Sequence, residues 1–152
     1  MADPIAFTSA SPRFGLPLLF SGQSQKEFYV NQAHLLADAL LHPVVSGIAN
    51  APPATPTEGQ SWIVSTAPTG AWIGHANAVA TYAGGAWTFV APQNGMRVFD
   101  SAAKQDIRYR NGWIRALATP APTGGTTVDT NARTAIVQLI AALVQAGVLP
   151  EA

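Results

Sequence analysis

Few residues in this chain carry the side chains that catalysis most often uses. Its three histidines, His34, His42 and His75, lie far apart, and it has no cysteine, so disulfides, cysteine-bound zinc and thiol nucleophiles are excluded. The eight Asp and Glu residues occur singly, and the motifs of zinc proteases, serine hydrolases, phosphate loops and dinucleotide-binding folds are absent. We therefore predict a non-enzymatic protein with no metal site and no cofactor.

Charged residues concentrate between residues 97 and 115, where five Lys and Arg stand against two Asp. Asp100 and Asp106 could lie on adjacent strands, as a hydrolase acting on cell-wall sugars would require of its two carboxylates. The basic residues beside them favour surface ion pairs instead. The basic surplus could contact an acidic surface or an anionic glycan, with a solvated strand face as the ordinary alternative.

Aromatic side chains offer a second kind of chemistry, because the apolar face of a sugar ring stacks on an aromatic ring. Core packing is the alternative explanation for most of them. Trp72 follows a turn at Thr69–Gly70, so we expect it to be the most exposed. The candidate glycan-stacking residues are Trp72, Tyr82, Trp87, Tyr109 and Trp113.

These aromatic residues fall in a region that reads as short strands separated by turns. We predict a central antiparallel meander of about six strands, at residues 61–65, 78–82, 86–90, 96–99, 106–110 and 113–117. Gly84-Gly85 and Asn111-Gly112 predict two hairpin turns, the second of type I′. Each turn should place a Tyr opposite a Trp, and the pairs expected are Tyr82 with Trp87 and Tyr109 with Trp113.

A helix is predicted over residues 25–41. Ser24 and Glu27 have the spacing of a capping box, and Pro43 ends the helix just after His42. Its apolar face is broad enough to be buried on two sides, against a sheet and against a neighbouring subunit. For Asn31 and His34 we expect structural hydrogen bonds rather than ligand binding. The candidate oligomer contacts on this helix are Phe28, Leu35 and Leu36.

A second helix is predicted near the C-terminus, with Asp129 as N-cap and Gly147 and Pro150 as the stop. Only Arg133 is charged along its apolar seam, so we expect the helix to pack against its symmetry mates as a short bundle. Docking on the chain's own sheet is the alternative. The candidate oligomer contacts here are Ile136, Leu139, Ile140 and Leu143.

The whole chain has the size of one domain, with 152 residues, a net charge of zero, 48% apolar residues and only 11% charged residues. Zero net charge argues against nucleic-acid binding, and so little surface charge favours self-association. We find no signal peptide and no apolar run of membrane-spanning length, so we expect no membrane partner.

Taken together, these elements predict an α+β fold of four parts. They are an extended anchoring arm (1–22) that docks on its own domain or on a partner chain, a domain of helix plus β-meander (23–118), a linker (119–127) and an oligomerisation helix (128–149).

Several ordered strings resemble a domain family of unknown function, DUF2793, over about residues 12–115. They are Gly15-Leu-Pro, Gly22-Gln-Ser-Gln-Lys-Glu27 with Asn31, Ala51-Pro-Pro with Glu58-Gly59, Thr69-Gly-Ala-Trp72 with Gly74-His75, and Gly85-Ala-Trp87-Thr-Phe89 with Pro92 and Gly95. Proteins of that family are encoded in tailed phages, prophages and gene transfer agents, and are associated with fibre or spike structures. The resemblance implies no catalytic residues.

This resemblance, with the arm and the apolar helices, predicts a short homotrimeric spike, fibre or adaptor protein of a phage-like particle. It would be assembled in the bacterial cytoplasm and reside in the virion. One end would anchor to a capsid or tail protein, and the other would hold a second spike or fibre protein or touch the cell surface; we favour the adaptor role. The competing hypothesis is a carbohydrate-binding module that recognises cell-surface polysaccharide through exposed Trp.

Overall fold

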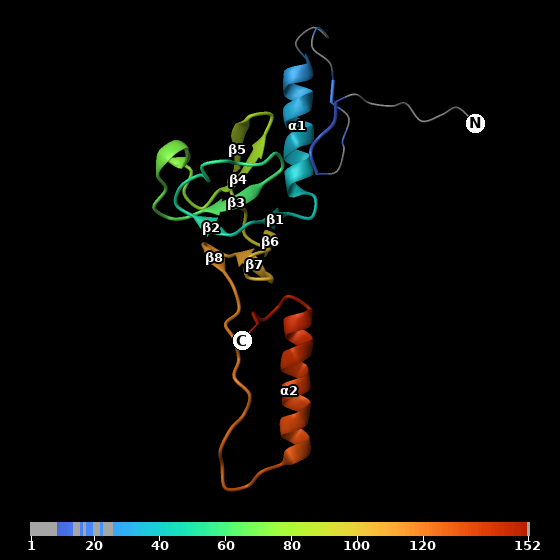
Figure 1. Ribbon diagram of the computed structural model, residues 1–152, viewed down its shortest axis with the longest axis vertical. Coiled ribbons are helices and arrows are strands. Elements are labelled where there is room, and N and C mark those ends of the chain that lie inside the picture. Colours follow the sequence, from blue (N-terminus) through green and yellow to red (C-terminus); the bar gives the residue numbers. More distant parts are fainter. Residues whose placement is uncertain (1–8, 14–15, 17, 20–21, 23–25, 152) are drawn as a thin grey trace, which may run out of the picture. The chain divides into compact units, whose positions relative to one another are not determined.

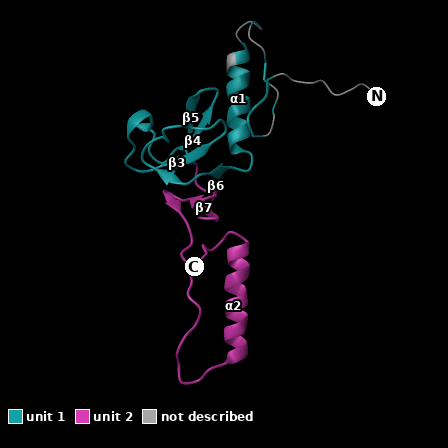
Figure 2. Cartoon of the chain, in the orientation of Figure 1, with its two compact units in different colours: residues 1–92 teal, residues 93–152 magenta. Residues whose placement is uncertain are grey.

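The computed structural model describes residues 9–13, 16, 18–19, 22 and 26–151. These residues form two α-helices, one short 3-10 helix and eight strands in two sheets, so the predicted α+β class is confirmed. Figure 2 colours two compact units, residues 1–92 and residues 93–152. Each unit is described by itself below.

The sheet of the first unit has the strand order β2-β3-β4-β5 (Figure 1). The short strand β1 (Val44–Val45) precedes β2 (Ile48–Ala49), which pairs in parallel with β3 (Ser61–Val64). Strands β4 (Val79–Ala83) and β5 (Ala86–Val90) then continue the sheet antiparallel. The β4–β5 connection is a two-residue turn in which Gly84 and Gly85 have φ of 62° and 78°, which glycine adopts without strain.

Both faces of this sheet are covered, because the paired residues Ile63 and Val79 are buried on one face, and a cluster of buried residues lies on the other. Val64, Trp72 and Ala80 are completely buried there. Trp72 ends the 3-10 helix η1 (Gly70–Trp72), which folds the β3–β4 connection back over the strands. The partly buried residues packed against this cluster are Ala49, Trp62, Trp87 and Phe89.

Helix α1 (Lys26–Leu40) follows the predicted helix to within a residue at each end. Ser24 of the predicted capping box lies outside the described residues, but the Glu27 carboxylate accepts a hydrogen bond from the Gly22 backbone N–H (3.2 Å). His42 then adopts the left-handed conformation with φ of 47°, immediately before Pro43. The helix therefore stops where the sequence predicts.

The described part of the N-terminal arm docks on α1 of its own chain. Buried Asp38 accepts hydrogen bonds from the Ser11 hydroxyl (2.7 Å) and the Arg13 backbone N–H (3.1 Å). The Arg13 guanidinium donates to the carbonyls of Asp38, Ala39 and His42. Carbonyls at a helix C-terminus have no partner within the helix, so the arginine satisfies groups that would otherwise need water.

The second unit contains an antiparallel hairpin with a short third strand. Strand β6 (Arg97–Asp100) pairs with β7 (Gln105–Tyr109), and β7 pairs with β8 (Trp113–Ile114). Val98 and Ile107 are directly opposite each other and buried. The buried carboxylate of Asp100 closes the β6–β7 turn by accepting from the N–H groups of Ala102 and Ala103.

Helix α2 (Thr130–Gln145) is capped as predicted, because the Asp129 carboxylate accepts from the Ala132 N–H (2.9 Å) and Gly147 follows with φ of 69°. The loop after it is tied to β7: the Asp106 N–H donates to the Gly147 carbonyl, and the Gln105 side chain donates to the Val148 carbonyl. Neither helix in the described part of the chain is long and apolar enough to cross a bilayer.

Two details of the predicted meander change. The six predicted strands are present, but they divide between two sheets, and β1 and β2 are two-residue strands that give no periodic signal. The Asn111-Gly112 turn is not of type I′, because Asn111 has a positive φ of 55° whereas Gly112 does not. The register pairs Tyr109 with Trp113, so three residues rather than two connect the strands.

Candidate functional site

Trp72 is not a sugar-stacking residue. The sequence led us to expect an exposed ring beside a turn, but its side chain is 0% exposed and part of the core. The reason is the helix η1, which turns the ring inward against Val64 and Ala80. Nothing short of local unfolding would bring it to a ligand.

The two predicted aromatic pairs do form across their hairpins. Tyr82 lies opposite Trp87 with ring centroids 5.2 Å apart, and Tyr109 lies opposite Trp113 at the same separation. All four side chains are half-buried. Trp87 also meets Trp72 edge to face at 5.1 Å, so part of its ring belongs to the core.

The two aromatic pairs belong to different units. Tyr82 and Trp87 belong to the first unit, whereas Tyr109 and Trp113 belong to the second. A stack that the sequence reasoning missed lies in the first unit, where the exposed His75 ring covers Phe89 at a centroid distance of 3.6 Å and an interplanar angle of 4°. No periodicity signals this contact, because His75 lies in an irregular loop.

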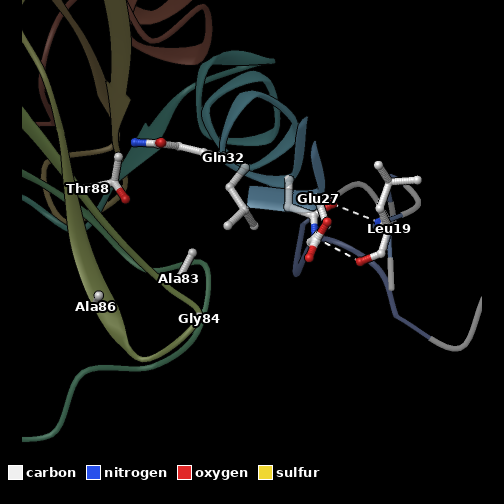
Figure 3. A pocket seen from close by; sticks show the side chains of 9 residues that line it. Leu19, Glu27, Gln32, Ala83, Gly84, Ala86 and Thr88 are labelled. Carbon is white, nitrogen blue, oxygen red and sulfur yellow. Dashed lines mark hydrogen bonds between the residues drawn. The ribbon is translucent and has the colours of Figure 1, made fainter. Parts of the chain in front are cut away.

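A groove in the described part of the first unit lies between α1 and the β4–β5 hairpin (Figure 3). Its volume is about 560 Å³. The helix contributes Glu27, Asn31, Gln32 and Leu35, the arm contributes Leu19, and the hairpin contributes Ala83, Gly84, Ala86 and Thr88.

The polar groups of this groove differ in how far they are already satisfied. Both polar ends of the Asn31 amide bond the Leu19 backbone, accepting from its N–H (2.7 Å) and donating to its carbonyl (2.9 Å), which confirms the structural role expected of Asn31. Gln32 extends toward Thr88 in Figure 3. The Glu27 Oε2 atom is buried and has no hydrogen-bond partner among the described residues.

These groups include a single carboxylate. Glu27 is the only carboxylate among the residues that line the groove, whereas glycoside hydrolysis needs a second carboxyl group across the cleft. No cluster of three or more potential metal ligands occurs within the described residues. The groove therefore offers one carboxylate, one amide and one hydroxyl above an apolar wall of Leu35, Ala83 and Ala86.

The predicted oligomer contacts on α1 have mixed environments. Leu36 is half-buried, and Leu35 is half-buried with part of its surface facing the chain's own groove. The side chain of Phe28 lies outside what the structure describes. The helix also exposes apolar residues that were not singled out as contacts, namely Tyr29, Val30, Leu40 and the following Leu41.

The predicted contacts on α2 are more accessible. No residue of this helix is buried, and Ile136 and Leu139 are 44% and 60% exposed. Ile140 and Leu143 are half-buried. The predicted alternative was docking of the apolar seam on the chain's own sheet; within the second unit, no residue of the seam is fully buried.

One known protein family matches the part of the chain that contains the strands. The family model for a protein of unknown function, DUF2793, matches residues 30–114, more than half of the chain. The chain belongs to the DUF2793 family. The DUF2793 match begins within α1 and ends at β8, so it includes every strand of both sheets and leaves α2 outside. No curated protein sequence matches the chain significantly.

Proposed function

We propose that this DUF2793 chain is a homotrimeric structural component of a phage-like particle, a short spike, fibre or adaptor that links capsid or tail to a receptor-binding fibre. We infer a phage-like particle because the chain resembles domains that are encoded in tailed phages, prophages and gene transfer agents. The observation that carries the oligomeric part is helix α2, none of whose apolar residues is fully buried.

The spacing of those residues is that of a coiled-coil seam. Ile136, Ile140 and Leu143 follow one another at steps of four and three residues, the spacing of the d, a and d positions of a heptad. Isoleucine at both a and d favours three or four strands, whereas isoleucine at a with leucine at d favours two, and the seam contains one pair of each kind. The seam therefore supports self-association, and the mass in solution decides the number of strands. Burying such a seam between subunits stabilises the oligomer by roughly 25 cal/mol for each Å² of apolar surface removed from water. A monomer leaves that surface in water.

Particle composition tests the functional part. Phage-like particles purified from a bacterium that encodes this chain should contain it, as measured by quantitative mass spectrometry and antibody labelling in the electron microscope. Deleting the gene should remove the labelled appendage and leave the filled capsid in place. A chain abundant in the lysate but missing from purified particles would contradict the proposal.

The alternative of a carbohydrate-binding module built on exposed aromatic residues has less support. Trp72 lies in the core, and the ring of Trp87 packs against Trp72 edge to face. An accessible aromatic surface is the His75–Phe89 stack. Glycan binding that is lost on His75→Ala, with the fold retained, would favour this alternative.

A further inference from the structure

The exposed face of the β6–β7 hairpin carries an unusual pair of charges. Arg97 and Arg108 are direct cross-strand partners, and both are exposed. Like charges at directly opposite positions destabilise a sheet. Neither guanidinium forms an ion pair or side-chain hydrogen bond with any residue that the structure describes. Their positive charge therefore has no partner within the second unit.

The two arginines line a shallow pocket of about 230 Å³ on this unit. A third arginine, Arg115, also lines it and donates a hydrogen bond from Nη2 to the Asp100 carboxylate at 2.8 Å. Asp100 is 2% exposed and accepts a hydrogen bond from the Ala102 N–H of the β6–β7 turn, so it holds Arg115 in a fixed position. Arg115 is thus held in place in the pocket, and the guanidinium groups of Arg97 and Arg108 also line it.

The pocket also contains an acceptor and an apolar wall. Asp106 lines it, and the Asp106 carboxylate has no hydrogen-bond or ion-pair partner among the described residues. The remaining lining residues are Ile114, Ala116 and Val148. A ligand for this pocket must therefore carry negative charge, offer hydroxyl donors to Asp106 and present some apolar surface.

We propose that this pocket, formed by Arg97, Arg108, Arg115 and Asp106, binds a uronic-acid unit of an acidic polysaccharide. A guanidinium fork matches a carboxylate bidentately, and Arg97 and Arg108 supply two forks on one face. The sugar hydroxyls donate to Asp106, and the C–H face of the ring lies against the apolar wall. Asp106 disfavours a polyphosphate or a purely acidic peptide, because such ligands bring negative charge without hydroxyl donors.

This inference goes beyond the structural role proposed above and does not depend on it. Binding is measured separately from oligomeric state and particle association. A monomer that binds acidic glycan would overturn the trimer and keep the pocket, and a trimer that does not bind would do the reverse.

The test is calorimetric titration of the full chain with oligogalacturonate of defined length. Arg97→Gln and Arg108→Gln should each weaken binding about tenfold, since each removes one bidentate contact. Arg110→Gln is the matched control, because it removes the same charge from an exposed residue at the end of β7 that does not line the pocket. It should change affinity less than twofold. Neutral dextran of equal length should not bind.

Several results would overturn the proposal. Equal losses in the Arg110→Gln and Arg97→Gln variants would mean non-specific charge attraction. Poly-glutamate of equal charge binding as tightly as oligogalacturonate would assign the surface to an acidic protein, and competition by inorganic phosphate at equal concentration would assign it to small anions. If a glutamine variant fails to fold, Arg97→Lys and Arg108→Lys keep the charge without the fork and should still weaken binding; unchanged affinity in both would refute the bidentate contact.

Discussion

At the scale of single residues, Arg13 does the most to join the arm to α1. Its guanidinium donates to three carbonyls at the end of the helix. Hydrogen bonds from a charged group contribute about 1.5–3 kcal/mol, so Arg13→Ala should lower the free energy of unfolding by about that much in urea titrations. Arg13→Lys, which lacks the fork, should lose part of it.

The control for this prediction is Arg110→Ala. Arg110 is exposed, and its substitution should change the free energy of unfolding by no more than about 0.5 kcal/mol. An Arg13→Ala variant as stable as Arg110→Ala would show that the arm does not depend on these contacts.

Trp72 gives a second prediction at this scale. Removal of a fully buried aromatic side chain leaves a large cavity, so Trp72→Ala should cost about 3–5 kcal/mol of unfolding free energy. Trp72→Phe should cost less, because it keeps most of the volume and removes an indole N–H that has no partner among the described residues. Chemical denaturation measures both variants.

The same prediction bears on glycan tests. Any loss of sugar binding in Trp72→Ala would report damage to the core rather than loss of a contact. A Trp72→Ala variant that kept wild-type stability and near-ultraviolet circular dichroism would contradict the buried position.

At the scale of elements, α2 gives the sharpest prediction. Ile136 belongs to the seam and is 44% exposed, so Ile136→Glu should leave the isolated chain folded and abolish its association. Gln138→Glu is the matched control, since it adds the same charge to an exposed neighbour outside the apolar seam. Sedimentation velocity should give a monomer for the first variant and the wild-type species for the second. Equal sedimentation of all three proteins would remove α2 from the interface.

Elements with strong local signals could be predicted from the sequence. Asp129 caps α2, Gly84-Gly85 forms its turn, and Pro43 follows the end of α1, because each residue has a backbone preference that acts over one turn of chain. The Tyr82–Trp87 pair followed from the Gly84-Gly85 turn, since the turn fixes the register of the strands beside it, whereas Tyr109 and Trp113 pair across a connection that is one residue longer than predicted.

Features that depend on distant contacts could not be predicted. The parallel pairing of β2 with β3 joins segments separated by the Pro-rich stretch 51–56, and nothing local specifies it. The burial of Trp72 follows from the fold of η1 over the sheet rather than from the turn signal beside it. The groove beside Glu27 likewise arises where residues distant in sequence meet, whereas the basic surplus at residues 97–115 was visible in the sequence.

At the scale of the whole molecule, the exposed apolar residues and the unpaired charged residues lie on different elements. Only 11% of the residues are charged, and the two helices expose large apolar side chains that a monomer would leave in water. The unpaired arginines, in contrast, gather on one hairpin of the second unit. We interpret the apolar helices as surfaces for self-association and the charged hairpin as a surface for a ligand.

The mass of the full chain in solution tests this account most directly. Size-exclusion chromatography with light scattering, at micromolar concentration, should give three times the 15.8 kDa of one chain. A stable species with the mass of a single chain under those conditions would contradict the central claim.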